Sequence, residues 1–167
     1  MAAIEAANDP KKDQKIELLM VGDSITHNFD KGGPGEKVWK KYFAPLNALN
    51  LGFGGDRTNH VLWRLDHLPS LKTAPKAASL MIGTNNICWG SDLPKQAADG
   101  VRAIAKKLNE MYPDMEILVL GVFLGGRKAL LFGGRAGGRG STIFRRADGQ
   151  LLHDVGNKRR PRHRELL

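Results

Sequence analysis

The stretch Ile16-Glu-Leu-Leu-Met-Val-Gly-Asp-Ser-Ile-Thr-His27 joins a short apolar run to a polar turn that contains a single serine. The run from Ile16 to Val21 has the length and composition of a buried β-strand, and the glycine and aspartate after it favour a turn. A serine in such a turn often starts a helix, but an exposed serine hydroxyl can also be a nucleophile. The rest of the chain has to distinguish between these two roles of Ser24.

Three more apolar runs resemble buried strands, and they alternate with helical patterns. The predicted strands are Ile16–Val21, Ala48–Leu51, Ala77–Ile82 and Glu116–Phe123. The predicted helices are Glu36–Phe43, Thr58–Leu68 and Pro94–Met111, where apolar residues recur at helical spacing. Alternating strands and helices predict an α/β fold in which a doubly wound parallel sheet carries helices on both faces.

The C-terminal part of the chain departs from this pattern. Residues 121–140 contain eight glycines without helical or strand period, so we expect a core at 1–123 followed by an irregular Gly/Arg-rich segment at 124–167. This segment completes the same single domain in part, with a short last strand at Leu151–Val155. It also carries the charge. Residues 121–167 hold 11 Lys/Arg and 3 Asp/Glu, a net of +8, whereas residues 1–120 hold 15 and 14, a net of +1.

Several functional classes are disfavoured by the sequence. The basic end, Lys158–Arg164, has no interleaved aromatic residues to stack bases, so we expect no nucleic-acid partner. Cys88 is the only cysteine, which excludes an internal disulfide and a cysteine metal cage. No histidine and carboxylate cluster has metal-ligand spacing, and no dinucleotide loop is present, so we expect no metal and no cofactor. The chain lacks a membrane-length apolar run and a signal-peptide pattern, which favours a cytoplasmic location.

Three polar motifs follow the first three predicted strands. They are Gly22–Thr26, Asn50–Thr58 and Gly83–Asn86. Each motif alone is explained as well by a turn, but the carboxyl ends of parallel strands meet at one edge, where ligands bind. Acyl transfer through a serine needs an exposed hydroxyl and N–H donors aimed at the oxygen that becomes negative. A serine, several glycines and two asparagines supply that combination.

The motifs Gly22-Asp-Ser-Ile-Thr26, Asn50-Leu-Gly-Phe-Gly-Gly55 and Gly83-Thr-Asn-Asn86 resemble the first three signature blocks of the SGNH (GDSL) hydrolases. The run Leu49–Leu65 is similar to the branch that contains the catalytic subunits of platelet-activating-factor acetylhydrolase. This resemblance, over residues 16–123, implies a flavodoxin-like three-layer α/β/α fold and hydrolysis of a small acyl ester, such as an acetyl ester. It implies Ser24 as nucleophile, the Gly55 N–H as backbone oxyanion donor and Asn85 as side-chain donor. Some members of the branch form homodimers, so self-association is expected.

The family's fourth block, a late Asp-x-x-His that completes the catalytic triad, has no match here, because no aspartate is followed by a histidine three residues later. In the interpretation we prefer, His153 belongs to the last strand and the block would lie beyond the end of this chain. In the other, a rebuilt C-terminal half brings His153 to the site as a substitute base. The Gly/Arg-rich sequence leads to the hypothesis that a deletion or frameshift has scrambled and shortened the end. We therefore expect reduced esterase activity.

Two alternative functions remain: a flavodoxin-like module that binds a phosphate or nucleotide, and a truncated or non-catalytic family member. Further expectations concern single residues. His27 is expected at the rim of the site, and His60 and His67 are expected to face solvent. Trp39 and Trp63 are interpreted as packing residues, and Trp89 either lines the acyl pocket or packs.

Overall fold

A computed structural model describes residues 15–33, 35–69, 71–89 and 92–122, together with the backbone of two strands at 143–145 and 151–154. The strands form one sheet in the order β2-β1-β3-β4-β5-β6. The first four are parallel: β1 (Leu18–Gly22), β2 (Ala48–Gly52), β3 (Ala77–Met81) and β4 (Glu116–Val119). β5 (Ile143–Arg145) and β6 (Leu151–Asp154) continue the sheet in antiparallel fashion. The predicted α/β class with a parallel sheet is confirmed.

The register of the parallel strands brings the three polar motifs to one edge. Gly22, the last residue of β1, pairs with Gly52 of β2 on one side and with Met81 of β3 on the other. A helix begins after each of these ends: α2 (Ser24–His27) after β1, α4 (Thr58–His67) after β2 and α5 (Thr84–Cys88) after β3. Segments about thirty residues apart in sequence therefore start from neighbouring positions.

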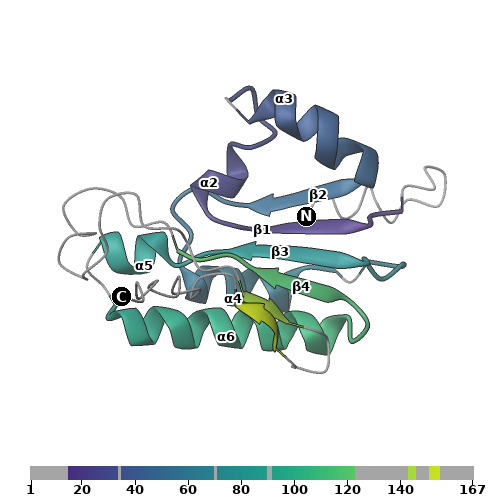
Figure 1. The fold of residues 1–167 in the computed structure, drawn as a ribbon. Helices are drawn as coiled ribbons and strands as arrows, with labels where there is room; N and C mark the ends of the chain where they lie inside the picture. The colour runs from purple at the N-terminus through teal and green to yellow at the C-terminus, as the bar shows by residue number, and fades with distance from the viewer. Residues whose placement is uncertain are drawn as a thin grey trace, which may run out of the picture.

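One face of the sheet is covered by α4 and α6 (Pro94–Met111), which lie side by side beneath it in Figure 1. The strands alternate, so Leu19 and Val21 point into this layer and are 2% exposed. Leu80 of β3 and Ile104 and Leu108 of α6 are fully buried in the same cluster. This cluster is the hydrophobic core, and β1 and β3, whose carboxyl ends lead into the motifs, pack on it.

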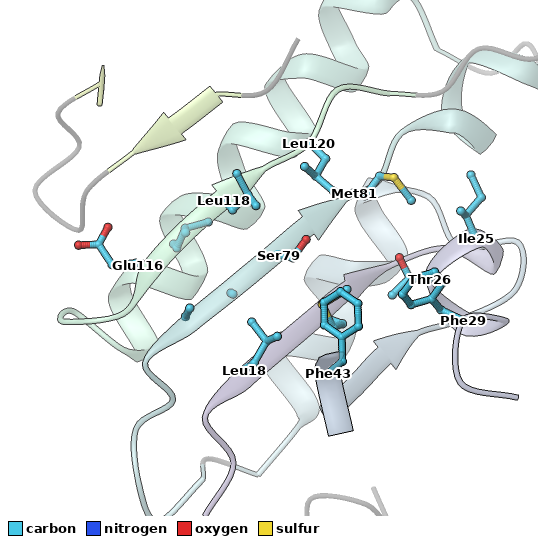
Figure 2. A pocket seen from close by; sticks show the side chains of 14 residues that line it. Leu18, Ile25, Thr26, Phe29, Phe43, Ser79, Met81, Glu116, Leu118 and Leu120 are labelled. Atoms are coloured by element: carbon cyan, nitrogen blue, oxygen red, sulfur yellow. The ribbon is translucent and has the colours of Figure 1, made fainter. Parts of the chain in front are cut away.

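The other face is covered over β2 and β1 by α3 (Glu36–Val38), a π-helical turn η1 (Trp39–Phe43) and a 3₁₀ turn η2 (Ala44–Leu46) (Figure 1). The predicted helix at Glu36–Phe43 is thus present, with a π-helical second half. Trp39 is buried as expected and stacks on Phe43, with their ring centroids 5.6 Å apart. Beyond these turns, side chains of β1, β3 and β4 line an apolar cavity of about 550 Å³ (Figure 2).

The structure departs from the sequence predictions at several points. β4 ends at Val119, earlier than the predicted Phe123, which lies outside the described residues, as do the glycine-rich residues 125–140 and the basic end 158–164. Strand β5 and the short helix α5 were not predicted, whereas β6 matches the expected last strand. No helix in the described part of the chain is both long and apolar enough to cross a membrane.

The packing role predicted for Trp63 is wrong. Its side chain is 60% exposed, because the apolar stripe of α4 runs through Val61 and Leu65 and leaves Trp63 on the solvent side. The indole stacks instead on His67, with the ring centroids 4.3 Å apart. His60 and His67 are exposed, as expected.

Candidate active site

The motifs Gly22–Thr26, Asn50–Thr58 and Gly83–Asn86 are called the first, second and third loop of the site. In the first loop, Asp23 caps α2. The backbone N–H of Ile25 donates to Asp23 Oδ1 at 3.0 Å, and Ser24 is the first residue of the helix. The helix-capping role considered for Ser24 therefore belongs to its neighbour, while Ser24 does open the helix. Asp23 is 1% exposed, and its burial raises the pKa of the carboxyl group, although the hydrogen bond from Ile25 acts in the opposite direction.

Hydrogen bonds join the first loop to the second. Asn50 Nδ2 donates to the Thr26 carbonyl oxygen at 2.8 Å, and the Phe53 N–H donates to the Gly22 carbonyl oxygen at 3.2 Å. His27, expected at the rim, accepts the Gly54 N–H on Nδ1 at 3.1 Å. These bonds fix the loop that carries the glycines against α2.

The close approach of the two loops explains one glycine of the second motif. A Cβ atom at Gly52 would lie 2.4 Å from the backbone nitrogen of His27, which is shorter than any real contact. A side chain at position 52 would therefore push the second loop away from the turn that carries Ser24.

In the second loop, Gly55 has a φ of +80°, a backbone conformation that only glycine adopts without strain. The next residue, Asp56, is buried and accepts two hydrogen bonds from Arg64 of α4, from Nε at 2.8 Å and from Nη2 at 3.2 Å. This contact raises the pKa of the Arg64 guanidinium. Arg64 also covers the Phe53 ring, with Cζ 3.8 Å from the ring centroid. The loop is thus anchored to α4 on both sides of Gly55.

The third loop is tied to the second through Asn85. Asn85 Nδ2 donates to the Asp56 carbonyl oxygen at 2.8 Å, and Asn85 Oδ1 accepts the indole N–H of Trp89 at 3.0 Å. The side-chain amide has two hydrogens, and among the described residues only one of them has a hydrogen-bond acceptor. The other has no acceptor among the described residues.

Asn86 has a different role from its neighbour. Its Oδ1 accepts the Thr58 N–H at 3.0 Å, and its Nδ2 donates to Thr58 Oγ1 at 3.0 Å and to the carboxylate of Asp92. Asn86 is 1% exposed, so it connects the start of α4 to the third loop from inside the protein. Asn85 and Asn86 are adjacent in the sequence, and nothing in their spacing indicates that Asn86 is the buried connecting residue and Asn85 the one beside the site.

The predicted site residues therefore lie at one sheet edge, with Ser24 at the start of α2, Gly55 in the loop before α4 and Asn85 in the first turn of α5. Hydrogen bonds connect the loop of Ser24 to that of Gly55, and the loop of Gly55 to Asn85. His153 lies in β6, where its backbone pairs with Phe144, and its side chain is outside the described residues. Within the described ranges, no group of three or more His, Cys, Asp or Glu residues is placed to hold a metal ion.

A model of the GDSL-like lipase/acylhydrolase family matches residues 20–150. The platelet-activating factor acetylhydrolase IB subunit alpha2 of Homo sapiens is 37% identical over 117 residues, which are 70% of this chain and 48% of that relative. The chain thus spans about half the length of the curated relatives that it matches.

Two solved structures are similar in fold. AlinE4, an SGNH-hydrolase family esterase, is 25% identical with a TM-score of 0.53, over 71% of this chain and 62% of the other. A candidate platelet activating factor from Streptococcus pneumonia is 25% identical with a TM-score of 0.58, over 81% of this chain and 58% of the other.

Proposed function

Since the chain belongs to the GDSL-like lipase/acylhydrolase family, we propose that it is a carboxylic ester hydrolase whose Ser24 takes a short acyl group from an ester and passes it to water. One observation carries this proposal. Asp23 caps α2 through its own carboxylate, so Ser24 stands at the helix start with a hydroxyl that the cap does not use. A serine at that position combines a reactive hydroxyl with a backbone N–H at the positive end of the turn.

In the proposed reaction, Ser24 Oγ attacks the ester carbonyl carbon and the carbonyl oxygen becomes negative. The N–H groups of Ser24 and Gly55 and the second Asn85 amide hydrogen donate to that oxygen. Collapse of the intermediate expels the alcohol, which takes a proton from water, and leaves the acyl group on Ser24. Attack by water then releases the acid and returns a proton to Ser24 Oγ. Each donor of this kind typically contributes about 3 kcal/mol to transition-state stabilisation.

The Ser24 proton passes to solvent water in this reaction, because the given sequence holds no Asp-x-x-His block to supply a base. Without a complete triad, oxyanion donors and substrate binding alone can still accelerate the reaction roughly 10³- to 10⁴-fold over its rate in water. We therefore propose that these 167 residues by themselves hydrolyse esters slowly. An acetyl group is the proposed acyl group, supported by the activity that the name of the human relative states.

The test is hydrolysis of p-nitrophenyl acetate by the full chain, by Ser24→Ala and by Ser79→Ala. Ser79 is the matched control, because it lies on β3 in the open apolar cavity, away from the loop edge (Figure 2). The account expects Ser24→Ala to lower the protein-dependent rate at least tenfold and Ser79→Ala to leave it unchanged. Equal rates for the full chain and Ser24→Ala would support a non-catalytic family member instead.

A further inference from the structure

Trp89 contacts Asn85 through two hydrogen bonds. From the sequence, Trp89 was expected only to line the acyl pocket or to pack. It follows α5, one helical turn after Asn85, and its backbone N–H donates to the Asn85 carbonyl oxygen at 3.3 Å. Its indole Nε1–H donates to Asn85 Oδ1 at 3.0 Å. The same residue thus binds both the backbone and the side chain of Asn85.

The two partners of the Asn85 side chain select one orientation of its amide. The Asp56 carbonyl oxygen only accepts hydrogen bonds, and it lies 2.8 Å from Nδ2. The Trp89 indole N–H only donates, and it lies 3.0 Å from Oδ1. Rotating the amide by half a turn would set oxygen against oxygen and N–H against N–H. The observed orientation therefore leaves one N–H of the amide without an acceptor among the described residues.

The exposure of Trp89 separates this role from core packing. Its side chain is 74% exposed, whereas Trp39 is 8% exposed. Substitutions at such exposed positions usually change stability by less than about 0.5 kcal/mol. A large functional change at position 89 would therefore come from the lost contact with Asn85.

We propose that Trp89 is a positioning residue that holds the Asn85 carboxamide in the orientation presenting its free N–H to the oxyanion. This inference rests on the proposed function, because it concerns a group that stabilises the transition state. The hydrogen bond acts mainly when the oxygen is negative, so its loss lowers kcat and leaves KM unchanged.

The experiment compares kcat and KM for p-nitrophenyl acetate in the full chain, Trp89→Phe and Trp89→His. Phenylalanine keeps an aromatic ring without a donor, while the imidazole Nε2 of histidine occupies the same ring position as the indole Nε1. Tyr42→Phe is the control, because Tyr42 is a 56% exposed aromatic residue on η1, outside the three loops. We expect Trp89→Phe to lower kcat about two- to tenfold, Trp89→His to recover most of the loss, and Tyr42→Phe to change nothing.

The outcomes separate this inference from the proposed function. If Ser24→Ala lowers the rate and Trp89→Phe does not, the positioning role is wrong and the hydrolase proposal stands. An equal loss in Trp89→Phe and Trp89→His, or a change in KM alone, also contradicts the positioning role. If Ser24→Ala has no effect, the proposed function fails, and the contact is then tested by the NMR signals of the Asn85 side-chain amide. These should shift in Trp89→Phe and return in Trp89→His; unchanged signals would overturn the inference.

Discussion

Asn85 Nδ2 donates to the carbonyl oxygen of Asp56 at 2.8 Å, so the third loop of the site is bonded directly to the loop that carries Gly55. Asp56 is in turn held by Arg64 of α4, and Asn85 is held by Trp89. The proposed oxyanion donors on these two loops are therefore fixed relative to one another before a substrate binds. Such preorganisation is what makes N–H donors effective in catalysis.

The neighbouring asparagines should respond differently to truncation. Asn86→Ala leaves the buried Thr58 N–H without its acceptor, so we expect a loss of about 2 kcal/mol in the free energy of unfolding. Asn85→Ala should instead lower kcat for p-nitrophenyl acetate about a hundredfold. Urea unfolding and steady-state kinetics on both variants measure the two effects. An Asn86→Ala variant with unchanged unfolding would show that the contact with Thr58 is unimportant.

The adjacent glycines Gly54 and Gly55 provide a matched pair. An added Cβ meets nothing within 4 Å at Gly55, so the cost of Gly55→Ala is the left-handed backbone, about 1 kcal/mol. At Gly54 the nearest atom to an added Cβ is His27 Nδ1 at 3.8 Å, and φ is not positive, so Gly54→Ala should be tolerated. Thermal unfolding compares them. Similar losses in both variants would contradict the assignment of the strain to position 55.

The ion pair between Asp56 and Arg64 should matter more than the surface pairs. Arg64→Met removes both hydrogen bonds that Arg64 donates to the buried Asp56 carboxylate and leaves His60 Nδ1 at 4.0 Å, so we expect a loss of about 2 kcal/mol in the free energy of unfolding. Arg102→Met is the control, because Arg102 pairs with Asp99 on the exposed side of α6, where such pairs contribute about 0.5 kcal/mol or less. Urea unfolding of both variants makes the comparison, and equal losses would argue against a special role for the buried pair.

Asp23 should make stability depend on pH. Burial raises its pKa above the ordinary 3.8, so the folded protein holds the Asp23 proton to a higher pH than the unfolded chain does. The contribution of Asp23 to stability therefore falls as the pH rises from about 4 through the raised pKa. Asp23→Asn keeps the acceptor for the Ile25 N–H and removes this titration.

The advantage of Asp23→Asn over the natural chain should accordingly be larger at pH 7 than at pH 4. Urea unfolding of both proteins at the two pH values measures it. An advantage that grows on acidification would mean that the Asp23 pKa is lowered in the folded protein, contrary to the effect of its burial.

Much of the fold is predictable because the spacing of apolar residues along the chain distinguishes helices from strands. α6 begins at Pro94 and ends at Met111 as predicted, since a proline suits the first turn and the apolar stripe is regular. The helical turn Thr84–Cys88 escaped prediction because glycine and asparagine are also typical of turns. β5 has only three residues, which are too few to display a period.

The grouping of the three motifs was predictable for a topological reason, because the ends of parallel strands share one edge. The separate roles of Asn85 and Asn86 were not predictable, since they depend on which groups lie opposite each side-chain amide in the folded protein. Trp63 illustrates the same limit. Its place on a helix with an apolar stripe suggested packing, but its position on that helix turns it to solvent. The catalytic roles of Ser24, Gly55 and Asn85 stay predictions.

The measurement that tests the central claim most directly is covalent labelling of Ser24. The full chain is treated with an organophosphonate that reacts with nucleophilic serines, and its intact mass and tryptic peptides are determined. The account predicts one adduct, on Ser24 within the peptide from Ile16 to Lys31, and no adduct in Ser24→Ala. An unlabelled chain, or the same labelling in Ser24→Ala, would contradict the claim that Ser24 is the nucleophile.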